Sequence, residues 1–94
     1  MPRPSRSSPS ERTSSWPDTP SDDPSGEVAR QFVLNLQAAM GEMSLRAAGA
    51  TTGVDHSSIQ GILQGRTWPD LDTIAKLERG LGATLWPGPG ASQE

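Results

Sequence analysis

Residues 44–65 read SLRAAGATTGVDHSSIQGILQG, a run in which two short helical patterns are separated by a glycine turn. Gly49 is a small residue at a point where one helix would press on the next. Gly53, four residues later, suits a turn that requires a positive φ. Ile59 and Ile62 lie three residues apart and would share one face of the second helix. The run therefore predicts two helices packed tightly across a turn at Gly53.

Capping residues set the expected bounds of these two helices. Ser44 is a good N-cap for a helix that runs to about Thr51, and Asp55 is a good N-cap for one that runs to about Gln64. Gly65 fits the left-handed position that closes a helix.

Apolar periodicity predicts one helix on each side of this pair. Residues 27–40 form a helix whose apolar residues recur every four positions, namely Val28, Phe32, Leu36 and Met40. Pro69 and Asp70 introduce a fourth helix, whose apolar face is expected to consist of Leu71, Ile74, Leu77 and Leu81.

Composition divides the 94 residues into three parts. Residues 1–26 are dominated by Ser, Pro, Arg and Asp and contain too little apolar surface to offset the entropy of ordering, so they are expected to be disordered. Residues 27–86 form the expected domain, and residues 87–94 form a flexible C-terminal tail. Trp16 is unexplained in this scheme, and the two alternatives are a short docking motif and no role at all. Deletion of residues 1–26 is expected to leave stability nearly unchanged.

Several classes of function find no support in the sequence. There is no cysteine, and His56 is the only histidine, so neither a disulfide nor a metal site is expected. No nucleophile with its base, no paired carboxylates and no phosphate-binding glycine loop are present, so we expect no enzyme, no cofactor and no small-molecule ligand. No apolar run is long enough for a signal peptide or a membrane span, and the expected location is the cytoplasm.

The pattern from Ser44 through Leu81 resembles the phage-repressor and Cro-type helix-turn-helix family, also called xenobiotic-response-element regulators. The resemblance rests on residues 52–59 (TGVDHSSI), 65–69 (GRTWP) and 71–77 (LDTIAKL). The ending Leu85-Trp86-Pro87 is similar to actinobacterial members. The resemblance implies an all-α, lambda-repressor-like bundle of four to five short helices, in which the third helix enters the major groove of DNA.

Site residues follow from the same resemblance. It implies base contacts by His56, Ser57, Gln60 and Gly61. It implies phosphate contacts by Ser44, Leu45, Gln64, Arg66 and Thr67. The sequence departs from the family pattern at two positions. Ala48 replaces a usual leucine, and Gly61 stands where a long polar side chain that contacts bases is common.

The function favoured by these residues is sequence-specific binding of double-stranded DNA by a bacterial or phage transcriptional regulator, such as a repressor. Few cations are available to bind phosphate, which predicts modest phosphate affinity. The near-neutral charge of the helix-turn-helix stretch also keeps open an alternative, a non-catalytic protein-interaction module such as an antitoxin or a complex subunit. Arg3, Arg6 and Arg12 allow the N-terminal segment to be an arm that touches DNA.

A homodimer is expected, because two half-sites double the contacts with DNA. Leu85 and Trp86 follow the fourth helix and are predicted to contribute to the dimer contact. The alternative is that Trp68 and Trp86 simply cover the edge of a small core.

Overall fold

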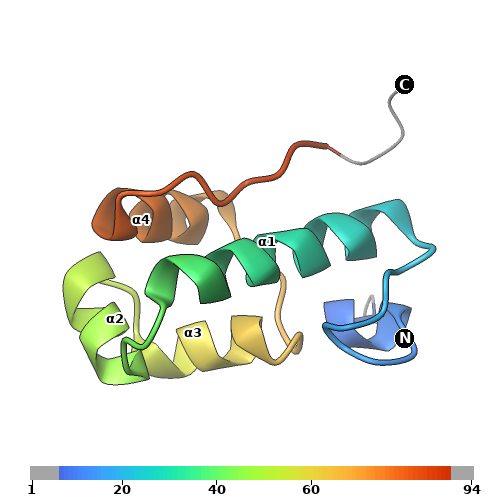
Figure 1. Cartoon of the computed structure of the whole chain (residues 1–94), viewed down its shortest axis with the longest axis horizontal. Helices are drawn as coiled ribbons and strands as arrows, with labels where there is room; N and C mark the ends of the chain where they lie inside the picture. The colour runs from blue at the N-terminus through green and yellow to red at the C-terminus, as the bar shows by residue number, and fades with distance from the viewer. Residues whose placement is uncertain (1–6, 90–94) are drawn as a thin grey trace, which may run out of the picture.

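The computed structural model describes residues 7–89 and shows an all-α fold, as predicted. In chain order it contains the 3-10 helix η1 (Pro9–Arg12) and the α-helices α1 (Pro24–Met40), α2 (Leu45–Thr52), α3 (His56–Leu63) and α4 (Leu71–Leu81). In Figure 1, α1 crosses the middle of the molecule, with α4 on one side of it, α3 on the other, and α2 at one end. None of the helices between residues 7 and 89 has the length and apolar content that crossing a membrane requires.

Each α-helix begins at a side-chain cap. The two predicted caps are confirmed: Ser44 accepts a hydrogen bond from the Ala47 N–H (3.0 Å) and Asp55 from the Ser57 N–H (3.0 Å). Asp70 caps α4 in the same way, accepting from the Thr73 N–H (2.8 Å). The first helix begins at Pro24 instead of residue 27. Asp23 caps it by accepting from the Gly26 N–H at 2.7 Å, and proline is favoured in the first turn because its missing N–H needs no partner.

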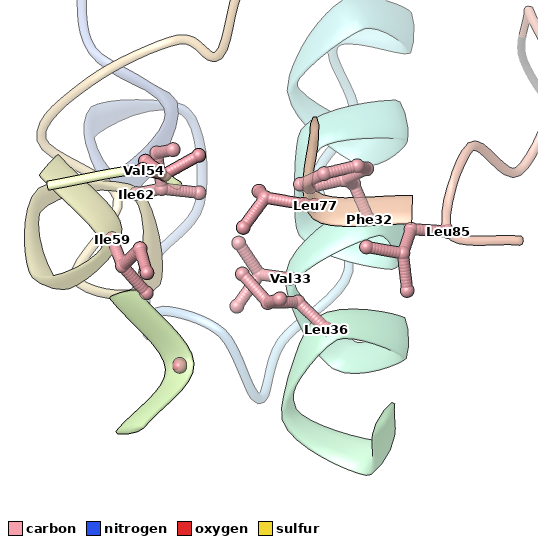
Figure 2. Close-up of a cluster of buried hydrophobic side chains, with 9 residues drawn as sticks. Phe32, Val33, Leu36, Val54, Ile59, Ile62, Leu77 and Leu85 are labelled. Carbon is pink, nitrogen blue, oxygen red and sulfur yellow. The ribbon is translucent and has the colours of Figure 1, made fainter. Parts of the chain in front are cut away.

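A single apolar cluster holds α1 against the other helices. Figure 2 shows Val33 and Leu36 of α1 and Leu77 of α4 directed toward Ile59 and Ile62 of α3. The full set of buried members is Phe32, Val33, Leu36, Ala48, Val54, Ile59, Ile62, Leu77 and Leu85. Ala48, the residue that replaces the family's leucine, is fully buried, so α2 packs closely on the core.

The predicted apolar faces of α1 and α4 differ from the observed ones at their ends. On α1, Val28 and Met40 are only partly buried, because the buried face follows residues 29, 32, 33 and 36. On α4, Leu71 was expected to face the core but is 83% exposed. It is the first residue of the helix, and the core contact begins one turn later, at Ile74 and Leu77.

The segment after α4 returns to the core through hydrogen bonds. Leu85 is buried, its carbonyl accepts from Asn35 Nδ2 at 2.9 Å, and its N–H donates to Glu78 Oε2 at 2.8 Å. The Trp86 N–H donates to the same carboxylate oxygen at 2.9 Å. These two backbone hydrogen bonds hold the pKa of Glu78 below its ordinary value.

The N-terminal segment departs from the sequence expectation. Residues 1–6 lie outside the described residues, but residues 7–23, here called the strap, pack against α1 and the end of α3. Pro9 is buried and Trp16 packs on the core cluster, with its Nε1 donating to the Leu63 carbonyl at 2.9 Å. The folded unit therefore begins before residue 27.

The strap is ordered because a few of its residues make contacts that its average composition does not reveal. The Ser10 N–H donates to the Gly65 carbonyl at 2.9 Å. Arg12 forms an ion pair with Asp23 at 2.8 Å, and its guanidinium lies 4.7 Å from the centre of the Trp68 ring. Each contact joins the strap to itself or to a segment far along the chain.

Of the predicted C-terminal tail, residues 87–89 are described and have no regular secondary structure, and residues 90–94 lie outside the described range.

Candidate nucleic-acid interface

The turn between α2 and α3 is tight and built on glycine. Gly53 adopts φ 80° and ψ 9°, as predicted, and its N–H donates to the Gly49 carbonyl at 2.9 Å. A Cβ on Gly49 would lie 3.0 Å from the Val54 carbonyl oxygen, closer than side chains normally approach. The Thr52 hydroxyl donates to the Ala48 carbonyl (2.7 Å) and accepts from the Val54 N–H (3.2 Å). These contacts fix the direction in which α3 leaves the turn.

One side of α3 is buried, and most of the other side is exposed. Ile59 and Ile62 face the core, as predicted. The exposed residues are polar: His56, Ser57, Ser58, Gln60 and, at the C-cap, Gln64. Three of the four residues for which base contact was predicted, His56, Ser57 and Gln60, are therefore in the exposed set.

Asp55 constrains Ser57. The Ser57 N–H and hydroxyl both donate to the Asp55 carboxylate, which lowers the pKa of that carboxyl. Because the hydroxyl hydrogen is engaged, Ser57 offers acceptor lone pairs to a ligand. The carboxylate also puts negative charge at the start of α3, where it opposes the approach of phosphate.

Gly61, the fourth predicted base contact, does not lie open to solvent. It is buried beneath the loop that follows α3. A Cβ on Gly61 would lie 3.1 Å from Thr67 Oγ1 and 3.6 Å from Arg66 Nη2. The loop has folded over this position because glycine leaves space there.

The residues predicted to meet phosphates lie at two ends of the helix pair. Ser44 is exposed at the start of α2, and Gln64, Arg66 and Thr67 are exposed after α3. Leu45 is half-buried and packs against the core, so a phosphate can meet its backbone but not its side chain.

Arg46 is a candidate that was not predicted from the sequence. It is exposed in the first turn of α2, and it lines one hollow together with His56 and Asp55 at the start of α3. The signal that could have identified Arg46 was its position directly after Leu45, a residue for which phosphate contact was predicted.

Ion pairs leave few cations free for a ligand. Arg12, Arg30 and Lys76 pair with Asp23, Glu27 and Asp72, respectively. Among residues 7–89, Arg46, Arg66 and Arg79 are the cations that form no ion pair. Within the same residues, no three His, Cys, Asp or Glu side chains are grouped so as to hold a metal ion.

A small all-α domain in which two short helices meet at a glycine turn and the second presents a polar face has the geometry of a helix-turn-helix domain. A family model described as helix-turn-helix matches residues 39–85, half of the chain. The chain therefore belongs to the helix-turn-helix family, as its resemblance to phage-repressor and Cro-type proteins predicted, and in general terms it is of the DNA-binding regulator class. No curated protein and no solved structure matches it.

Proposed function

We propose that the protein binds double-stranded DNA sequence-specifically and acts as a bacterial or phage transcriptional regulator. The observation that carries this proposal is the placement of unpaired arginines at both ends of a polar helix. Arg46 lines a hollow with His56 at the start of α3, and Arg66 follows its end. Such a surface offers hydrogen-bonding groups for base edges between two cations that attract the phosphate backbone.

Base recognition is assigned to the exposed side chains of α3. Gln60 pairs with adenine through its amide, which matches the N6 and N7 edge, while His56 and Ser57 contact neighbouring bases. Phosphates are assigned to the start of α2, at Ser44 and the backbone of Leu45, and to Gln64, Arg66 and Thr67 after α3. Three unpaired cations in residues 7–89 make few phosphate contacts, so the expected salt dependence is shallow.

A second copy of the chain is the expected partner on DNA. Trp86 is 48% exposed and is available for such a contact. Leu85, the other residue predicted to take part, is buried within its own chain, so the dimer contact is assigned to Trp86 without it.

Selection from a random pool of DNA duplexes tests the proposal. The wild-type protein is expected to enrich one sequence, with half-sites related by two-fold symmetry. The Gln60→Ala variant is expected to lose affinity for that sequence by about 1–3 kcal/mol while retaining its affinity for random DNA.

Ser58→Ala serves as the matched control, since it removes an exposed polar group from the same helix that has no assigned contact. A wild-type protein that enriches no sequence would instead support the protein-interaction module.

A further inference from the structure

Gly61 lies on the same side of α3 as Ser57, an exposed residue that is assigned to base contact, but Gly61 itself is buried. It follows Ser57 by four residues, so the two Cα–Cβ directions point to one side of the helix. Two groups of the following loop reach this side: Thr67 Oγ1 lies 3.1 Å and Arg66 Nη2 3.6 Å from the position of a Gly61 Cβ. A side chain longer than a methyl group at position 61 would therefore compete with Thr67 and Arg66 for space.

We propose that Arg66 reads a guanine in the major groove and that Gly61 is the residue that makes room for it. This inference rests on the proposed function and changes the role of Arg66 from the phosphate contact that the family resemblance implied.

The backbone of Arg66 is held in position before any ligand binds. Its N–H donates to the Gly61 carbonyl at 2.9 Å, which ties the loop to α3. Gly65 takes φ 73°, which turns the chain back over the helix, and its carbonyl accepts from the Ser10 N–H of the strap. Trp16 closes the other side, because a Cβ on Gly65 would lie 2.7 Å from its ring.

The guanidinium itself is free to bind. Arg66 is exposed and forms no ion pair with any residue between 7 and 89, although Asp70 lines the same hollow. Neighbouring groups in that hollow are hydroxyls, from Ser57, Ser58, Thr67 and Thr73. An arginine fork beside a helix in the major groove matches the O6 and N7 acceptors of guanine, which no other base presents together.

The test distinguishes the planar pair of donors on the Arg66 guanidinium from its positive charge. Arg66→Lys keeps a positive charge for phosphate but lacks the planar pair of donors. In random-pool selection, it is expected to lose the preference for guanine at one base pair of each half-site by about tenfold or more, with the salt dependence unchanged. Gly61→Leu is expected to lose the same preference, because a long side chain there would compete with Thr67 Oγ1 and Arg66 Nη2, which lie 3.1 and 3.6 Å from the position of the Cβ.

Arg79→Lys is the matched control, because Arg79 is exposed on α4, forms no ion pair among residues 7–89 and has no assigned contact with DNA, and it is expected to keep the wild-type sequence preference. Thermal unfolding of each variant verifies that it is folded. If Arg66→Lys selects the same sequence with the same discrimination as the wild type, the inference is overturned while the proposed function stands. If the wild type selects no sequence, the proposed function fails, and the inference fails with it.

Discussion

At Gly53 the backbone is left-handed and the space around it is open. No heavy atom lies within 4 Å of the position that a Cβ would occupy, so a substitution there is limited by backbone strain and not by a clash. Gly53→Val is expected to lower the free energy of unfolding by about 1–2 kcal/mol, because β-branched residues tolerate positive φ poorly. Urea denaturation measures this loss.

Gly53→Asn provides the comparison at the same position, since asparagine enters the left-handed region at lower cost. Equal stability of the valine and asparagine variants would contradict the assignment of the penalty to backbone conformation.

A second residue-level effect concerns Glu27 and Arg30 in the first turns of α1. Arg30 donates to both carboxylate oxygens, at 2.9 and 2.7 Å, and to the Pro17 carbonyl at 3.0 Å. The hydrogen bonds from Arg30, with smaller contributions from Gln31 and Ser21, lower the pKa of Glu27 from 4.5 to about 2. The pair therefore joins the strap to α1 through a charged contact that is mostly buried.

Because the folded state lowers this pKa, the pair stabilises the protein above pH 4.5 and loses that contribution as the pH falls toward 2. Glu27→Gln is expected to be less stable than the wild type by about 2 kcal/mol at pH 7. The difference should shrink toward zero as the pH falls through about 2. Denaturation curves recorded across this range measure the difference, and a gap that stays constant with pH would rule out the ion pair as its source.

At the scale of elements, we expect the strap to make the N-terminal part of the chain contribute to the stability of the domain. Trp16 connects it to the end of α3 through the hydrogen bond to Leu63 and through contact with the core. Trp16→Ala is therefore expected to lower the free energy of unfolding by about 2 kcal/mol, the sum of lost packing and a lost hydrogen bond. This reverses the expectation that residues 1–26 are dispensable for stability.

Ser14→Ala is the control for the strap, because Ser14 is exposed and its substitution is expected to change stability by less than about 0.5 kcal/mol. Chemical denaturation of both variants provides the measurement. A loss of less than about 0.5 kcal/mol for Trp16→Ala would show that the strap does not stabilise the domain.

At the scale of the whole molecule, one exposed aromatic side chain bears on association. Trp86 borders an apolar hollow together with Phe32, Trp68 and Ile74, which leaves apolar surface open on the side of the C-terminal segment. Sedimentation of the wild type is expected to show a dimer, and Trp86→Ala a folded monomer.

Leu85→Ala separates association from folding. Leu85 is 1% exposed, so its truncation should cost about 2–5 kcal/mol of stability as a core cavity and should not act selectively on the dimer. A wild-type protein that sediments as a monomer at high concentration would remove the dimer contact from the proposal.

The sequence alone determined the features that depend on residues within one helical turn of each other. The caps at Ser44 and Asp55 and the left-handed glycines at positions 53 and 65 could be predicted, because each requires a particular residue type at a fixed local spacing. Together with the apolar period, they were enough to predict the four α-helices and the polar face of α3.

Only the tertiary structure decided which distant residues meet. Trp16 reaches Leu63 across 47 positions, and Trp68 donates to the Ser7 carbonyl across 61 positions, so average composition predicted disorder for a segment that packs. The same holds for Gly61, whose burial depends on a loop held by the strap. Such contacts depend on how the chain returns through space, and local spacing carries no information about that path.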